Sequence, residues 1–94
     1  MRVMFLVHEE VDNVGVAVED IPEGMASTGR FRDQPGELEV TVSEPVKLGH
    51  KVALRDIAVG DEVIEYGVAI GRATRDIQQG QCVHTHNLKG QRWS

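Results

Sequence analysis

The sequence predicts an all-β fold, a compact barrel or clip built from short, bent strands. Its apolar residues show almost none of the three-to-four-residue spacing of an amphipathic helix. Valine dominates the apolar positions, and its branched side chain suits a pleated sheet better than a helix. Ten glycines interrupt the 94 residues at short intervals, which is typical of strands joined by frequent tight turns. These observations favour one small β domain over residues 1–94.

Two segments alternate as a half-buried strand does. The three valines of Val14–Val18 share one face, and in Glu37–Val42 the apolar residues face one side and the polar residues the other. Short apolar runs between turns predict further strands at Arg2–Val7, His50–Leu54, Glu62–Ile64, Ile70–Arg75 and Gln81–His86. Residues 25–36 lack any period and are interpreted as a surface hairpin or loop, and residues 88–94 as a tail. Trp93 in that tail either folds back on its own domain or anchors the chain in another subunit.

One local pattern, Asp-Ile-x-x-Gly, occurs three times, at Asp20–Gly24, Asp56–Gly60 and Asp76–Gly80. The isoleucine provides an apolar plug, and the glycine can take the positive φ that a tight turn needs. We interpret the pattern as a repeated structural corner between strands and not as a catalytic motif.

Composition excludes several classes of protein. A net charge of −5 with 4% aromatic residues does not fit a nucleic-acid-binding surface. The first apolar run is too short for a signal peptide or a membrane span. Cys82 is the single cysteine, so the chain forms no internal disulfide, and we expect a reducing, cytoplasmic location. A domain this small buries only about 60–65% of its unfolded surface, so a partner chain, self-assembly or a bound ion is expected to complete it.

The segment Cys82-Val83-His84-Thr85-His86-Asn87 is the sharpest candidate for a site. On a strand, Cys82, His84 and His86 would face the same side, with about 6.6 Å between neighbours. Two imidazoles at that spacing can converge on one ion, which makes the histidines candidate ligands for a metal or a substrate. A chance His-x-His on a surface strand is the alternative. Cys82 fits a small buried apolar residue better than a ligand.

His50 and Lys51 open a predicted strand directly after a glycine, where side chains can reach into a cleft. Histidine can transfer protons near pH 7, and lysine can bind a carboxylate or stabilise an enolate. The alternative is that both are solvated turn residues. His8 ends the first predicted strand and could face the same cleft, whereas Asp12 and Asn13 are by default an Asx turn before the next strand.

Four blocks, in their order and spacing, resemble the N-terminal domain of the altronate and galactarate dehydratases, a SAF domain with a β-clip fold. The blocks are Asp12–Val18, Gly49–Ile57, Val63–Gly71 and Asp76–Asn87. With His8 they cover nearly the whole chain outside residues 25–36. The resemblance implies β-elimination from hydroxy acids with loss of water, or of sulfite in related sulfo-lyases. It also implies a divalent metal, iron first and manganese as the alternative.

The ending His84–Lys89 followed by Arg92 and Trp93 is similar to the small subunits of two-chain relatives, such as split altronate dehydratases and sulfolactate sulfo-lyases. The resemblance therefore implies a large, dehydratase-like catalytic subunit as partner, a small hydroxy or sulfo acid such as altronate or sulfolactate as substrate, and a homo-oligomer as a further expectation. Neither nucleic acid nor membrane is expected as a partner.

The resemblance also distributes roles among the candidate residues. His50 and Lys51 are the expected catalytic residues, because they can bind substrate or assist proton transfer. His84 and His86 are the expected metal ligands, with His8 as a further candidate. Asp12, Asn13 and Asn87 are expected to bind substrate. The alternative to a lyase subunit is a non-catalytic β-clip module that binds a substrate or a metal and supports assembly.

Overall fold

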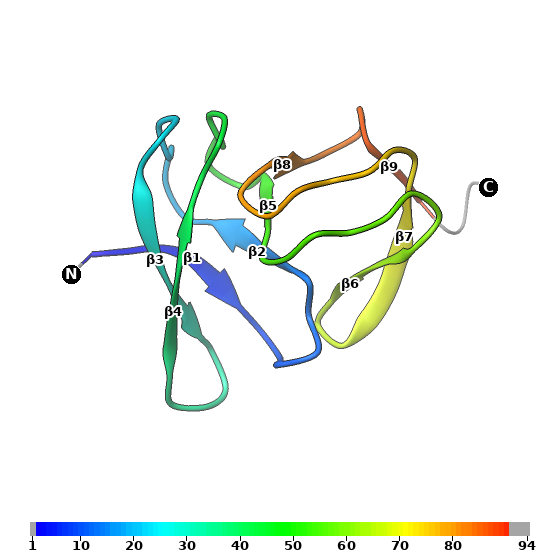
Figure 1. Cartoon of the computed structure of the whole chain (residues 1–94). Coiled ribbons are helices and arrows are strands. Elements are labelled where there is room, and N and C mark those ends of the chain that lie inside the picture. The colour runs from blue at the N-terminus through cyan, green and yellow to red at the C-terminus, as the bar shows by residue number, and fades with distance from the viewer. Residues whose placement is uncertain (1, 91–94) are drawn as a thin grey trace.

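The computed structural model describes residues 2–90 and shows only strands, turns and bends there (Figure 1). The strands are β1 (Val3–Val7), β2 (Val14–Ala17), β3 (Ala26–Phe31), β4 (Glu37–Thr41), β5 (Lys51–Ala53), β6 (Glu62–Glu65), β7 (Val68–Ala73), β8 (Cys82–Val83) and β9 (Leu88–Gly90). One sheet has the order β4-β3-β1-β2-β5-β8, and the other has the order β6-β7-β9. The all-β prediction is confirmed. Residues 2–90 include no helix that could cross a membrane.

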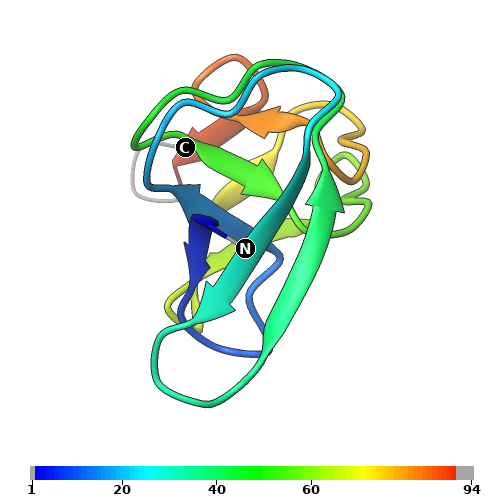
Figure 2. The same ribbon diagram turned by 90° about the vertical axis from the view of Figure 1, so that its left-hand side faces the viewer.

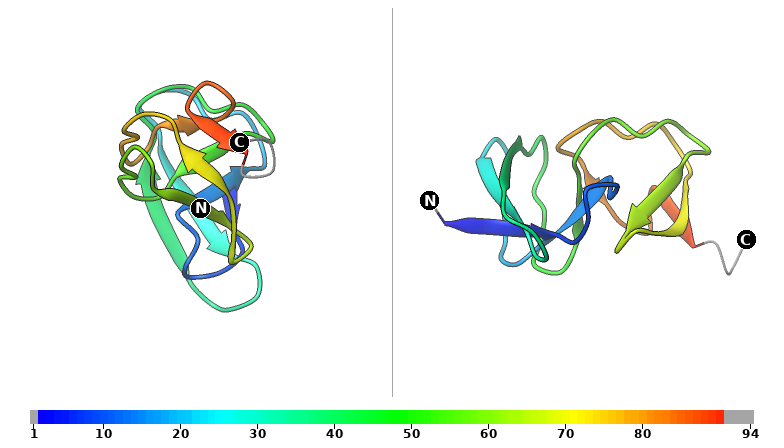
Figure 3. Two further views of the ribbon diagram at one scale, coloured as in Figure 1. Left: turned by 90° about the vertical axis from the view of Figure 1, so that its right-hand side faces the viewer. Right: turned by 90° about the horizontal axis from the view of Figure 1, so that it is seen from below.

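Strands β2, β5 and β8 contribute side chains to two separate apolar cores. Val52 packs in a core with Phe5 and Met4, whereas its neighbour Ala53 packs in a second core with Ile57 and Ile77. Successive residues of a strand point to opposite faces, so a strand between two cores is apolar on both. Seen from below, β1 lies toward one end of the elongated molecule and β9 toward the other, with β2 between them (Figure 3).

The three predicted corners are present, and a fourth, at residues 45–49, completes them. The four corner glycines have nearly the same positive φ: 84° at Gly24, 85° at Gly49, 88° at Gly60 and 90° at Gly80. The corners pair across the chain, because Ile21 exchanges two backbone hydrogen bonds with Val46, and Ile57 does so with Ile77. The fourth corner was missed because it carries Pro45-Val46 in place of Asp-Ile.

The aspartate at the start of the pattern has a hydrogen-bonding role in the paired corner. The carboxylate of Asp56 accepts the backbone N–H of Gln79 in the paired corner at 2.9 Å, and Asp76 accepts that of Val59 at 2.9 Å. Each carboxylate thus satisfies a turn amide that the partner corner leaves without a backbone acceptor. The structural interpretation of the repeat is confirmed.

Of the two interpretations of residues 25–36, the structure supports the hairpin, and six of these residues belong to β3. It pairs in parallel with β1 and antiparallel with β4, with which it forms a long hairpin (Figure 2). Its buried residues are polar or small: the Ser27 hydroxyl donates to the carbonyl of Val40 at 2.8 Å, and Gly29 leaves room for the ring of Phe5. Without apolar alternation, the strand had no detectable period.

The predicted tail is wrong for its first residues. Leu88–Gly90 form β9, which pairs with β7, and the Leu88 side chain packs against the second core. Its three residues are too short to show a period. Trp93 lies outside the described residues.

Candidate active site

The strand predicted for Gln81–His86 ends at Val83, and residues 84–87 form a turn. Asn87 closes this turn, because its side-chain oxygen accepts the N–H of His84 at 2.9 Å and its amide donates to the carbonyl of Cys82 at 2.9 Å. The prediction that Cys82, His84 and His86 share one strand face is therefore wrong. Cys82 is buried in the first core, as expected, and both histidines are exposed.

The turn places His84 against His50. Their rings stack with centroids 4.1 Å apart and planes within 10° of parallel. The pairing of β5 with β8 brings these two segments together, and the corner at Gly49 delivers His50 to the start of β5. The sulfur of Cys82 lies 4.0 Å from Nδ1 of His50. Burial, followed by the charge of Glu44, raises the pKa of that thiol, so Cys82 is a neutral packing residue at pH 7.

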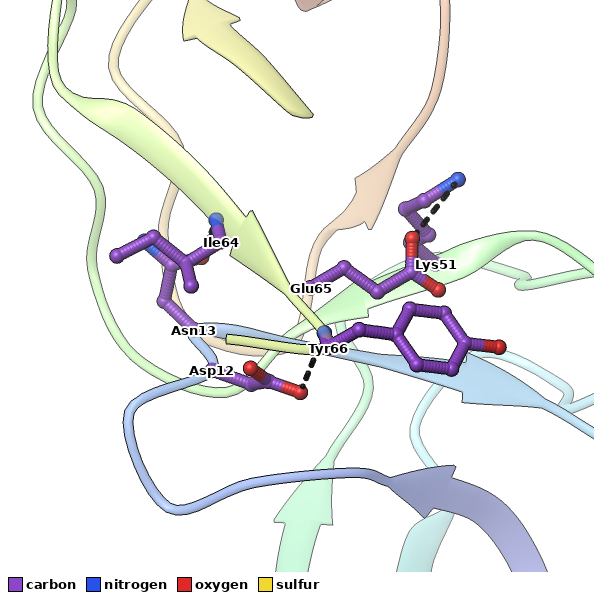
Figure 4. Close-up of polar contacts among 6 residues, drawn as sticks. All are labelled: Asp12, Asn13, Lys51, Ile64, Glu65 and Tyr66. Atoms are coloured by element: carbon purple, nitrogen blue, oxygen red, sulfur yellow. Dashed lines mark hydrogen bonds and ion pairs between the residues drawn. The ribbon is translucent and has the colours of Figure 1, made fainter. Parts of the chain in front are cut away.

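Lys51 extends from β5 toward the second sheet. Its ammonium nitrogen lies 3.9 Å from a carboxylate oxygen of Glu65, with 23% and 12% of the two side chains exposed. Figure 4 shows these two side chains and that of Tyr66 close together at the end of β6. Because the pair is partly shielded from water, the charge of Lys51 acts on neighbouring groups more strongly than a fully solvated lysine would.

Loss of hydration and nearby positive charge from His50 and Lys51 lower the pKa of His84 below its ordinary value of 6.5, and His86 adds in the same direction. The charged form is thus disfavoured in the folded chain, so His84 is neutral at pH 7 and its imidazole is free to accept a proton. The charges of His50, Lys51 and His86 all act on His84, and we call these four residues the cationic face.

The lowered pKa gives a direct test of this cluster. In an NMR titration of the folded chain, the midpoint of His84 is expected below 6.5. Replacing Lys51 with glutamine removes one of the positive charges that lower the pKa, so the midpoint should move upward. Glutamine at Lys47, an exposed residue of the corner before His50, is the matched control and should leave the midpoint in place. An unmoved midpoint in the Lys51 variant would separate Lys51 from the cluster.

Asp12 and Asn13 hold the hairpin that carries Glu65. Asp12 is 1% exposed, and its carboxylate accepts the backbone N–H groups of Tyr66 at 3.1 Å and Gly67 at 2.8 Å. Asn13 pins β6 by accepting the N–H of Ile64 at 2.7 Å (Figure 4) and donating to the carbonyl of Glu62 at 2.9 Å. Both side chains thus have structural partners, as does Asn87, and their binding of substrate stays a prediction.

His8 lies apart from the stacked pair. Its ring contacts that of Tyr66, with centroids 3.5 Å apart, and it borders an open hollow of about 450 Å³. The remaining lining of this hollow includes Glu9, Glu10 and Asp33. Three carboxylates would repel an anionic acid, so the cationic face, and not this hollow, is the candidate active site.

The expected metal does not fit the described residues. Residues 2–90 contain no group of three or more His, Cys, Asp or Glu side chains placed to hold an ion. Ring nitrogens bind metals in the plane of the imidazole at about 2.0–2.1 Å, and two stacked, nearly parallel rings do not direct their nitrogens at one point. His84 is therefore poorly placed to share an ion with His50. The expected ligands, His84 and His86, belong to no such group within residues 2–90, and their binding of a metal stays a prediction that needs ligands from another chain.

Sequence reasoning assigned no role to two residues beside Lys51. Glu65 gave no signal, because its ion pair joins strands from different sheets. Tyr66 gave a weak one, since Tyr-Gly stands where a tight hairpin turn usually has Asn-Gly.

Comparison with known proteins finds similarity to one family and to its members. The family model described as the altronate/galactarate dehydratase SAF domain matches residues 3–91. The chain is 44% identical to the (2R)-sulfolactate sulfo-lyase subunit alpha of Chromohalobacter salexigens, over 99% of this chain and 100% of that protein. It is 42% identical to the subunit of the same name from Paracoccus pantotrophus, over 61% of this chain and 85% of that protein. It is 35% identical to the altronate dehydratase of Bacillus subtilis, over 95% of this chain but 16% of that protein.

Proposed function

The chain belongs to the altronate/galactarate dehydratase SAF domain family, and from this we propose that it is the small subunit of a lyase that performs β-elimination on a small hydroxy or sulfo acid. The full-length similarity to one sulfo-lyase alpha subunit, together with the partial similarity to a second, favours (2R)-sulfolactate as the first substrate to test and sulfite as the leaving group. Altronate, with loss of water, is the second.

The observation that carries this proposal is the cationic face. His50 and His84 stack there, and the positive charge of Lys51 acts on His84, on a chain whose net charge is −5. Local positive charge on an acidic molecule favours binding of a small anion at that face over the rest of the surface. A carboxylate with a second anionic group, as in sulfolactate, would be bound most strongly there.

The same groups suit the chemistry of elimination. A C–H bond next to the carboxylate breaks and its electron pair forms the C=C bond of an enol. The bond from the adjacent carbon to sulfur breaks with its pair leaving on sulfite, or the bond to oxygen breaks with its pair leaving on hydroxide, which takes up a proton and departs as water. The enol then tautomerises to the keto acid. The ammonium of Lys51 would stabilise the charge that develops on the carboxylate oxygens. The imidazole pair would take the proton, because His84 is neutral at pH 7.

A larger partner follows from the proportions of the relatives. The domain accounts for 16% of the Bacillus subtilis altronate dehydratase and 13% of the Escherichia coli galactarate dehydratase. In those enzymes most of the chain lies outside this domain. We therefore infer that a large dehydratase-like subunit covers the exposed cationic face here and supplies the rest of the active site, including the ligands of any iron or manganese ion.

The test is reconstitution with a large dehydratase-like chain from the same organism. The complex is incubated with (2R)-sulfolactate, altronate and galactarate, and sulfite and the keto-acid product are measured. We expect product from one acid with the complex and none with either chain alone. Full activity of the large chain alone would instead support the non-catalytic module, as would a fully active complex in which His50, Lys51 and His84 are all alanine.

A further inference from the structure

The hairpin that carries Glu65 contains an unusual residue at its turn. Strands β6 and β7 are joined by only two residues, Tyr66 and Gly67, with φ of 58° and 72°. Turns with two positive φ values favour asparagine, aspartate or glycine at the first position, since these residues tolerate the left-handed region. Among residues 2–90, Tyr66 is the one residue other than glycine with a positive φ. A bulky side chain in that conformation is unfavourable for folding.

Hydrogen bonds from the backbone to the Asp12 carboxylate hold Tyr66 in this conformation. Both oxygens of the buried Asp12 carboxylate are used, one accepting from Gly67 at 2.8 Å and the other from Tyr66 at 3.1 Å and Glu9 at 3.2 Å. A carboxylate with three backbone donors fixes the turn whichever side chain occupies its first position. The identity of residue 66 is therefore not needed for closing the turn.

Packing does not explain the tyrosine either. Its side chain belongs to neither core, and the residue is 52% exposed. Its ring touches that of His8, and its hydroxyl has no hydrogen-bonding partner among residues 2–90. The ring extends from the end of β6 on the side where Lys51 and Glu65 lie (Figure 4). A strained, exposed side chain beside a candidate site points to function more than to stability.

We propose that Tyr66 is a substrate-contacting residue, whose phenol hydroxyl donates a hydrogen bond to an anionic oxygen of the acid held by Lys51. This inference rests on the proposed function. A phenol hydroxyl donates a hydrogen bond along a defined direction, so it adds direction to the undirected attraction of the ammonium. The His8 ring limits the orientations of the tyrosine ring. The cationic face would then extend from the His50–His84 stack, through Lys51, to the β6–β7 turn.

The test uses the reconstituted complex and two substitutions at one position. Tyr66→Phe removes only the hydroxyl. Its kcat/KM on the acid that the wild type converts is expected to fall roughly 10- to 100-fold, mainly through a higher KM, with an unchanged melting temperature. Tyr66→Asn replaces the strained residue with one that the turn favours, so this variant should melt at or above the wild-type temperature and lose activity to the same extent. Val68→Thr, at an exposed position on the same hairpin, is the control and should behave as the wild type.

Each contrary outcome has a separate meaning. Wild-type kcat/KM in Tyr66→Phe would overturn the assignment, since the hydroxyl would then make no hydrogen bond that contributes to binding or turnover of the substrate. A clearly lower melting temperature in Tyr66→Asn would also overturn it, because the tyrosine would then serve the fold. If the wild-type complex converts none of the acids, the proposed function itself fails, and the two results cannot be confused.

Discussion

Replacing Lys51 with glutamine is expected to lower kcat/KM of the reconstituted lyase by about 10²–10³-fold, the cost typical of removing one group that stabilises developing negative charge. The expectation rests on the environment of the ammonium. The Lys51 side chain is three-quarters shielded from solvent beside Glu65, where a charge is screened less than at an open surface. The decrease in kcat/KM should be larger than the removal of one solvated charge would produce, because the Glu65 carboxylate is left unpaired and repels the substrate.

A second substitution separates these two effects. In the double variant Lys51→Gln/Glu65→Gln, the unpaired carboxylate is neutralised, so any loss of melting temperature in the single variant should be recovered. Activity should stay low, because the ammonium is still absent. Lys47→Gln, which removes an exposed lysine near the same strand, should retain wild-type kinetics. If the double variant were as active as the wild type, Lys51 would act only as the counter-ion of Glu65 and not on substrate.

Local chemistry decided what could be predicted from the sequence. The corners at Ile57 and Ile77 were recognisable because aspartate and glycine are needed there for hydrogen bonding and positive φ. Strands with an apolar alternation, such as Glu37–Val42, were found nearly within their observed bounds. Strand β3 escaped, since its inward face is built from serine, threonine and glycine, which carry no hydrophobic period.

In the candidate site too, local features were predictable from the sequence, whereas contacts between distant segments were not. His50 and Lys51 were predicted from residue type and position. The structure stacks His50 on His84 and pairs Lys51 with Glu65, and their catalytic role stays a prediction. The error at His84 came from extending β8 through residues that Asn87 closes into a turn. Strand spacing alone could not reveal a ring stack, because stacking depends on the β5–β8 pairing between segments more than 30 residues apart. Glu65 was undetectable for a similar reason, since its partner lies in another sheet.

Gly80→Ala is expected to be the most destabilising single substitution among the corner glycines. At a φ of 90°, a Cβ atom is unfavourable in itself, and at this position it would also collide with the backbone carbonyl oxygen of Thr41. The left-handed conformation costs about 1–2 kcal/mol, and overpacking against a group that cannot rotate away adds about 1–3 kcal/mol. The sum is a large part of the roughly 5–14 kcal/mol expected for a domain of this size.

Gly60→Ala is a closely matched control, because Gly60 has a φ of 88° in the equivalent corner and nothing within 4 Å of its missing Cβ. This variant should lose only the conformational part of the free energy of unfolding, about 1–2 kcal/mol. Each kcal/mol lowers the melting temperature of a small domain by about 4–8 °C. Thermal melts of the two variants therefore isolate the contact with Thr41. Equal melting temperatures would show that the corner relaxes away from β4. Since Gly80 directly precedes the segment that delivers Cys82 and His84, relaxation without loss of stability should still appear as a shifted His84 titration.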